Sequence, residues 1–325
     1  IDENNKLKVT GNAEQLPASE LPYPNLDRQR SGIQKFGGND ELFHKLFQPF
    51  KRSELSDFMV GDQIYEELKY FERKYKNKKI AKLHVSRGCV ARCTFCQRAT
   101  KGYRVYPLNY LESHIIELKE KYNVGALKIY DENFGSNRKH SYEIARLIKK
   151  YDLTWAVQNA RVTSFIYEDL KFYKEHHMTF VQFGIESGSQ KILDIIEKKV
   201  TLKDLYNTLA NCKKAHVGTN PENMLLGMPG ETRETVIESS QFTASIRYLL
   251  GMDWNVPGNP LVIAIPGTPL YEYCQQIGVI GKTLDEEEDY LIRMSSLDAK
   301  SILDYVNKTN ASVKEVHYWT YLYRY

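Results

Sequence analysis

RGCVARCTFC, residues 87–96, places three of the chain's five cysteines within eight residues, at Cys89, Cys93 and Cys96. Their spacing is C-x3-C-x2-C. Thiolates are soft ligands that suit zinc or an iron–sulfur cluster. A closed structural zinc site takes four ligands, and a four-iron cluster normally takes four cysteines. Three cysteines therefore predict a metal centre that keeps one coordination position open.

The spacing alone leaves two other interpretations of the metal centre open. A distant His or Cys could complete a zinc site, and His84 is near in sequence, although it falls within a predicted strand. A fourth cysteine elsewhere would instead give a ferredoxin-like electron carrier. The remaining cysteines, Cys212 and Cys274, stand alone, and we expect them to be small buried residues.

The composition is that of a globular protein, with 42% apolar and 26% charged residues among 325. A net charge of +4, spread along the chain, does not indicate a nucleic-acid partner. No apolar run approaches the roughly 20 residues of a membrane span, and no signal-peptide pattern opens the sequence. Five cysteines, an odd number with three of them clustered, do not resemble a disulfide framework and fit a metal protein of the reducing cytoplasm.

Short apolar strands alternate with helical patterns from residue 80 onward, which predicts an α/β fold built from parallel βα units. A capping pattern at Thr201 and Asp204 marks the start of one helix. Such units form either an open sheet or a partial barrel, and periodicity does not decide between them. In both, the functional edge lies where strands end and helices begin. The predicted strands are residues 80–85, 126–130, 154–158, 180–185, 223–227 and 261–265.

The regions outside this pattern divide the chain into three parts. Residues 1–78 are rich in loops and then helical, and we interpret them as a linker or helical N-terminal extension. Residues 79–282 form the predicted core, and residues 283–325 a C-terminal extension. Because the first residue is Ile1 rather than Met, we expect the chain to be a piece of a longer protein.

Four stretches that follow predicted strands, together with the cysteine run, resemble a known family. RGCVARCTFC, with Phe95 as its aromatic residue, resembles the C-x3-C-x-aromatic-C motif of the radical S-adenosylmethionine (SAM) superfamily. The last three of the four stretches also resemble the branch of that superfamily that is often fused to a cobalamin-binding domain. The resemblance covers roughly residues 80–280. The four stretches are YDENF (130–134), GIESGSQKIL (184–193), LLGMPGET (225–232) and PGTPLYE (266–272).

This resemblance implies a partial (βα)6 barrel of the radical SAM type with N- and C-terminal extensions. It implies that Cys89, Cys93 and Cys96 hold a 4Fe-4S cluster, which reductively cleaves SAM to methionine and a 5′-deoxyadenosyl radical. The radical would activate a small-molecule, lipid or natural-product substrate, for cobalamin-dependent C-methylation or a related carbon modification. A flavodoxin or ferredoxin type of protein would supply the low-potential electron.

Two alternatives to this function stay open. One is a cobalamin-independent radical enzyme that performs hydrogen abstraction, epimerisation or rearrangement. The other is a non-catalytic iron–sulfur or zinc module, although such a module has no need of the GIES and GMPGE stretches.

Residues at the matching strand ends are the candidates for binding SAM. The carboxylate of Glu186 could accept a hydrogen bond from a ribose hydroxyl or the methionine amine, and Arg161 could bind the methionine carboxylate. Glycines in GMPGE would let the backbone approach adenine. Helix capping remains an alternative for the Asp, Glu and Ser candidates. The full candidate set is Phe95, Asp131, Glu132, Gln158, Arg161, Glu186, Ser187, Gly227, Met228 and Gly230.

The sequence also departs from relatives in this superfamily. No cysteine precedes Cys89, so the N-terminal cluster of the methylthiotransferases is missing. No D-x-H-x-x-G cobalamin signature is present, and residues 1–79 hold too few strands for a corrin-binding domain. We therefore expect a cobalamin domain, if the protein has one, to lie upstream of Ile1.

Overall fold

The computed structural model describes residues 47–49, 69–71, 73–97, 102–219, 224–251, 261–295 and 305–322, besides the single residues Glu20 and Lys35. Most of the predicted extension over residues 1–78 lies outside these ranges, although residues 69–71 and 73–74 are helical as expected. The boundaries proposed at residues 79–282 and 283–325 stay predictions. No helix of the described residues is long and apolar enough to cross a membrane.

The parallel sheet predicted from the strand pattern is confirmed. Four strands run parallel in chain order, and the two-residue strand β1 (Gln48–Pro49) pairs antiparallel with β2 at the edge, where a proline is tolerated. Every residue of β5 is buried, as expected for a strand covered on both faces. The four parallel strands are β2 (Lys79–Leu83), β5 (Val124–Ile129), β6 (Thr154–Ala160) and β7 (Met178–Phe183).

The fifth and sixth predicted strands are shorter than expected. Residue 223 is outside the described ranges, and the rest of 223–227 makes only the parallel bridges Glu186–Met224 and Leu226–Leu261. Gly227 has φ +82°, which ends the extended conformation there. These bridges continue the curve of the sheet past β7, so the arrangement is that of a partial barrel.

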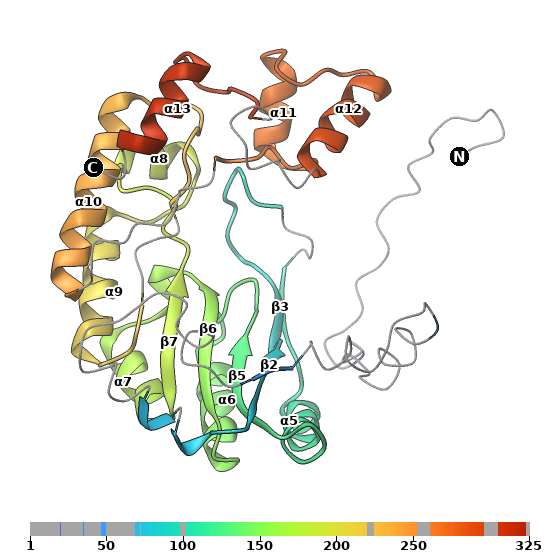
Figure 1. Ribbon diagram of the computed structural model, residues 1–325, viewed down its shortest axis with the longest axis vertical. Helices are drawn as coiled ribbons and strands as arrows, with labels where there is room; N and C mark the ends of the chain where they lie inside the picture. The colour runs from blue at the N-terminus through green and yellow to red at the C-terminus, as the bar shows by residue number, and fades with distance from the viewer. Residues whose placement is uncertain are drawn as a thin grey trace.

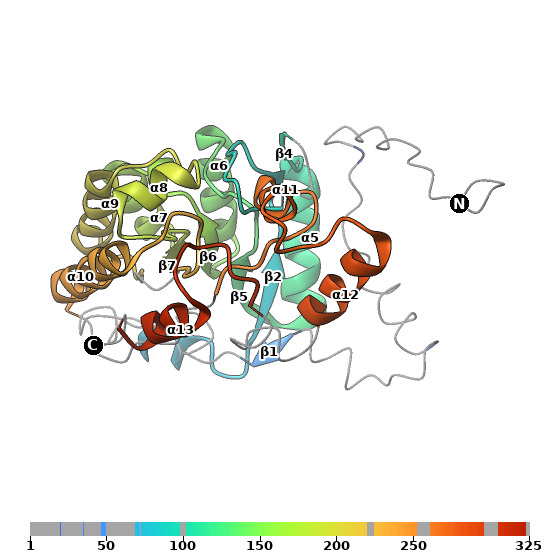
Figure 2. The same ribbon diagram turned by 90° about the horizontal axis from the view of Figure 1, so that it is seen from above.

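Helices cover the convex side of the curved sheet (Figures 1 and 2). The capping box predicted at Thr201 and Asp204 is confirmed: the Asp204 N–H donates to Thr201 Oγ1 at 3.1 Å, and the Thr201 N–H donates to Asp204 Oδ2 at 2.8 Å. The helices are α5 (Leu108–Tyr122), α6 (Arg138–Lys150), α7 (Tyr167–Glu175), α8 (Gln190–Ile195), α9 (Leu202–Lys214), α10 (Arg233–Leu250), α11 (Pro269–Gln276), α12 (Leu284–Ser295) and α13 (Val313–Leu322).

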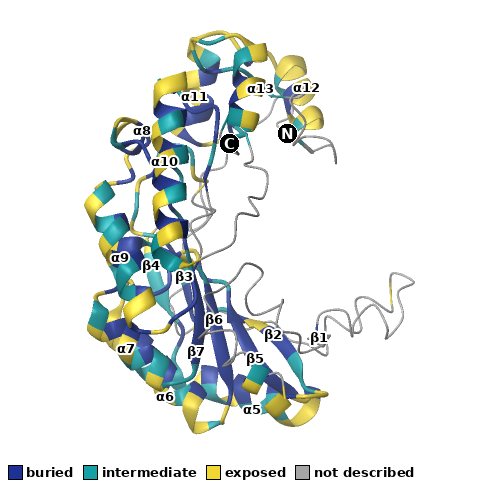
Figure 3. Cartoon of the chain, turned by 60° about the vertical axis from the view of Figure 1, so that its left-hand side comes forward, coloured by how far each residue is buried: buried dark blue, intermediate teal, exposed yellow. Residues whose placement is uncertain are grey.

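The two faces of the sheet pack differently. The strands of the sheet are mostly buried (Figure 3). The convex face forms the large core with the helices, where Phe134, Trp155 and Tyr173 meet edge to face and are almost fully buried. The concave face has a smaller apolar cluster, in which Phe71 packs with residues such as Phe180. As in other folds built from parallel βα units, the functional edge is expected at the carboxyl ends of the strands.

A two-stranded antiparallel ribbon holds both ends of the cysteine loop. Strand β3 (Ser86–Gly88) ends directly before Cys89, and β4 (Tyr103–Val105) receives the chain when it returns. The carboxylate of Asp131, at the end of β5, accepts hydrogen bonds from the Val85 N–H at 2.8 Å and from the Ser86 hydroxyl. The ribbon is thereby fixed to the carboxyl edge of the main sheet.

The buried carboxylate of Asp131 predicts a pH-dependent stability. Burial raises its pKa from 3.8 to about 6, against the opposing effect of its two hydrogen bonds. The folded state therefore binds the proton more tightly than the unfolded state, and the resulting stabilisation, complete below pH 3.8, is lost as the pH rises through 6. Relative to Asp131→Asn, we expect the wild-type free energy of unfolding to fall by up to about 3 kcal/mol between pH 4 and 6.5.

Chemical denaturation of the two chains across this pH range measures the difference. Asp285→Asn, at an exposed position of α12, is the matched control and should keep the wild-type pH profile. Parallel pH profiles for wild type and Asp131→Asn would contradict the assignment.

Candidate functional site

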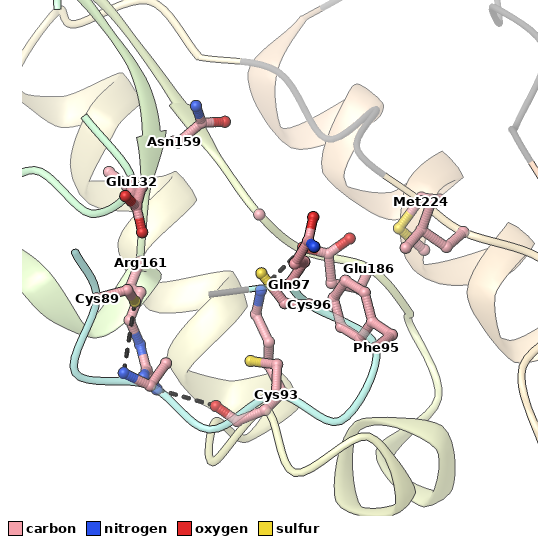
Figure 4. A pocket seen from close by; sticks show the side chains of 15 residues that line it. Cys89, Cys93, Phe95, Cys96, Gln97, Glu132, Asn159, Arg161, Glu186 and Met224 are labelled. Carbon is pink, nitrogen blue, oxygen red and sulfur yellow. Dashed lines mark hydrogen bonds and ion pairs between the residues drawn. The ribbon is translucent and has the colours of Figure 1, made fainter. Parts of the chain in front are cut away.

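A cavity of about 480 Å³ opens at the carboxyl ends of β6 and β7, beside the cysteine loop (Figure 4). It brings together side chains from stretches that are up to 136 positions apart in sequence, from Cys89 to Leu225. The predicted site residues that line it are Cys89, Cys93, Phe95, Cys96, Glu132, Arg161 and Glu186. Asn159, Lys198 and Met224 also line it and were not predicted.

The three cysteines carry free thiols along one wall of this cavity. Burial raises the pKa of the Cys93 and Cys96 thiols, while the positive charges of Lys198 and Arg161 act in the opposite direction on Cys93. Cations beside a thiol favour the thiolate, which is the form that binds metal. His84, the other candidate ligand, follows β2 and does not line the cavity.

The thiols fit a cluster by their chemistry and common cavity. In the described part of the chain, no set of three or more Cys, His, Asp or Glu side chains is placed to hold a single metal ion. The three thiols therefore do not converge on one point. A four-iron cluster takes its thiolates on separate irons, so ligands spread along one wall suit it. The residues present therefore fit a cluster with three protein ligands.

Asp131 and Glu132 have different places. Asp131 is fully buried beneath the ribbon and does not line the cavity, so its structural role is to hold the cysteine loop. Glu132 lines the cavity and accepts a hydrogen bond from the Gly88 N–H at 3.3 Å, directly before Cys89. Of the two predicted acids, only Glu132 is available to a bound ligand.

A buried ion pair crosses the cavity wall. Lys198 Nζ lies 2.9 Å from Glu186 Oε1, and the two side chains are 7% and 14% exposed. Gly184 makes room for the pair, since a Cβ there would lie 2.6 Å from the Glu186 oxygen and 2.9 Å from the Lys198 nitrogen. Arg161 donates to the Lys198 carbonyl at 2.9 Å. The three charged groups thus form one connected unit.

Gln158 was expected in the site, but its neighbour Asn159 lines the cavity instead. The pairing of β6 with β7 shifts register between Val157 and Ala160, and Asn159 has φ +64°. Such a bulge changes which residue faces a given side of the strand. Regular alternation along a strand could not reveal it.

Four further predicted residues do not line the cavity. The Ser187 hydroxyl lies 3.2 Å from that of Ser239 on α10, so it docks its loop on that helix. The N–H groups of Gly227 and Met228 donate to the Glu231 carboxylate within their own turn. At Gly230, φ is +76° and a Cβ would meet Ile195. These residues support the segments that carry the site.

The missed residues had no clear sequence signal. Lys198 stands in the charged run EKK (197–199), which is typical of a solvated helix end, yet it is buried. Met224 belongs to an apolar run, and the sequence does not show which residues of such a run face the cavity. Only the pairing with Glu186 identifies Lys198 as part of the site.

Comparisons with known proteins agree with the geometry. A family model described as "Radical SAM superfamily" matches residues 83–243. An uncharacterized methyltransferase of Pyrococcus horikoshii is 29% identical over 193 residues, which cover 58% of this chain and 40% of the relative. Cytidylyl-2-hydroxyethylphosphonate methyltransferase of Streptomyces wedmorensis is 25% identical over 241 residues, or 71% of this chain and 43% of the relative. The chain thus spans less than half the length of these relatives.

A solved structure shares the fold. The radical S-adenosylmethionine methyltransferase TsrM from Kitasatospora setae, with cobalamin and a 4Fe-4S cluster bound, gives a TM-score of 0.52 at 18% identity. The match covers 67% of this chain and 43% of that chain. The family expected from RGCVARCTFC is confirmed: residues 83–243, with their cysteine loop at the carboxyl edge of a curved parallel sheet, form a domain of the radical SAM superfamily.

Proposed function

We propose that this chain is the core of a radical SAM enzyme in which Cys89, Cys93 and Cys96 hold a 4Fe-4S cluster. The observation that carries the proposal is that the three cysteines and the largely buried Glu186–Lys198 pair line the same cavity. When bound, the cluster would supply the electron that cleaves SAM to methionine and a 5′-deoxyadenosyl radical. The chain's own residues bind and orient SAM and keep water out.

The charged groups of the cavity match the two ends of a methionine moiety. Glu186 and Glu132 can accept hydrogen bonds from an ammonium group, and Arg161 and Lys198 can bind a carboxylate. Because Lys198 is already paired with Glu186, binding of SAM exchanges one ion pair for two without leaving a buried charge alone. Asn159 can donate and accept hydrogen bonds from the same wall.

For the reaction that follows, we propose methylation of a small-molecule substrate with cobalamin. The support is that two relatives are named as methyltransferases and that a cobalamin-containing methyltransferase shares the fold. A low-potential electron donor of the flavodoxin or ferredoxin type would reduce the cluster.

Loss of one cysteine tests the cluster assignment. After anaerobic reconstitution, the wild-type chain should hold about four irons, because each cubane cluster contains four. Cys93→Ala should lose most of this iron, whereas Cys212→Ala, at a fully buried cysteine away from the cavity, should keep it. Metal analysis and the absorbance of the cluster measure both. Stoichiometric zinc without iron uptake would refute the cluster and the function with it.

Substitution of the buried acid tests the SAM site. Glu186→Gln keeps the shape of the side chain but removes the charge, so SAM should bind roughly 10- to 100-fold more weakly, as expected for the loss of a charge-assisted hydrogen bond. The iron content should not change. Glu197→Gln, at an exposed position next to Lys199, is the control and should bind SAM normally. Equal affinities for all three chains would reduce Glu186 to a structural role.

The methylation step is tested with reduced, reconstituted protein that includes any segment upstream of Ile1, where a cobalamin domain is expected, and with methyl-labelled SAM. Formation of S-adenosylhomocysteine that requires added hydroxocobalamin would support cobalamin-dependent methylation. If 5′-deoxyadenosine were instead the only product and cobalamin had no effect on it, the cobalamin-independent alternative would be favoured.

A further inference from the structure

A tyrosine of the C-terminal segment packs directly on the turn that follows the cavity wall. Tyr305 Oη donates to the Gly227 carbonyl at 3.0 Å. Gly227 has φ +82°, and a Cβ there would lie 2.4 Å from Tyr305 Oη and 2.8 Å from two ring carbons. The backbone of the turn therefore lies against the face and hydroxyl of one tyrosine, which leaves no space for a side chain.

The same turn is held from within by Glu231. Its Oε2 accepts hydrogen bonds from the N–H groups of Gly227 and Met228. The Glu231 side chain is 2% exposed, and within the described part of the chain its Oε1 has no hydrogen-bond partner. A buried carboxylate in this position needs a compensating positive charge nearby.

Lys308, three residues after Tyr305, supplies that charge. It is 3% exposed, its Nζ donates to the Val306 carbonyl at 2.8 Å, and it lies 4.2 Å from the centroid of the Tyr305 ring. Burial lowers the pKa of Lys308 to about 8 and raises that of Glu231 to about 7, while each charge stabilises the other. Tyr305 thus contacts the turn by packing and hydrogen bonding, and Lys308 packs on the Tyr305 ring while its charge acts on the Glu231 carboxylate that holds the turn.

This turn is continuous with the site. Met224 and Leu225, three and two residues before Gly227, line the cavity, and the Leu225 N–H donates to the Glu186 carbonyl at 2.9 Å. Figure 4 shows Met224 and Phe95 toward one end of the cavity and Cys89 with Arg161 toward the other. If the methionine part of SAM binds beside the thiols and charged groups, its nucleoside part must extend toward the apolar Met224 end.

We propose that Tyr305 and Lys308 are positioning residues that fix the nucleoside side of the SAM site through the Gly227–Met228 turn. This inference rests on the proposed function. Both residues lie beyond residues 83–243, the part that matches the family model, so the C-terminal segment completes the cofactor site from outside that domain.

Removal of one hydroxyl tests the inference with little risk to folding. Tyr305→Phe should weaken SAM binding about three- to tenfold, as expected for one neutral hydrogen bond. Binding of methionine alone, measured from its effect on the electron paramagnetic resonance signal of the reduced cluster, should not change, and neither should the iron content. Tyr318→Phe, at an exposed position on α13, is the matched control.

Hydrogen exchange of the peptide over residues 225–231 gives a readout independent of SAM. Tyr305→Phe and Lys308→Met should both speed exchange there, and Tyr318→Phe should not. Unchanged exchange, unchanged SAM affinity, or equal losses of SAM and methionine affinity would each overturn the inference. If the wild-type chain bound no SAM, the proposed function would fail, and the positioning role would fall with it even if exchange showed that Tyr305 holds the turn.

Discussion

One buried carboxylate, that of Asp131, joins the cysteine loop to the sheet. It links the end of β5 to the start of β3. Cys89, the first residue after β3, is thereby placed at the carboxyl edge of the sheet. Its hydrogen bonds to Val85 and Ser86 offset part of the cost of burying the charged acid, and burial still raises the pKa of Asp131 to about 6. The position of the cavity, between this loop and the ends of β6 and β7, follows from that connection.

Charge balance is the second constraint on the site. Three thiols that must lose protons share the cavity with two acids, and Arg161 and Lys198 supply the positive charge near them. Lys198 comes from the segment after α8, Arg161 from the end of β6, and Glu186 from the end of β7. Their hydrogen bonds connect the segments that follow β6, β7 and α8, so the same contacts balance charge in the site and join these segments.

The sequence predicted the parallel strands and the cysteine loop because both leave strong local patterns: buried apolar runs and three thiols in eight residues. It predicted Glu186 and Arg161 in the cavity because each follows a strand. The sequence pointed to Gln158 rather than Asn159, because a β-bulge leaves no trace in the alternation of apolar and polar residues along a strand. Ser187 and Gly227 were expected to face SAM, yet they contact α10 and Tyr305, because contacts between distant segments are invisible in local spacing. Lys198 was missed for the same reason.

The ribbon beneath the cysteine loop has a consequence for the maturation of this protein. Both ends of the loop are held by β3, β4, Asp131 and Glu132, and none of these contacts uses a cysteine. Val90, within the loop, is 61% exposed. Small zinc domains fold only when they bind their metal. Here the contacts that hold the ends of the loop do not involve the cysteines. Biogenesis can therefore proceed in two separate stages, in which the polypeptide folds first and iron and sulfide are delivered afterwards to a loop whose Cys96 is exposed and whose Cys93 is buried.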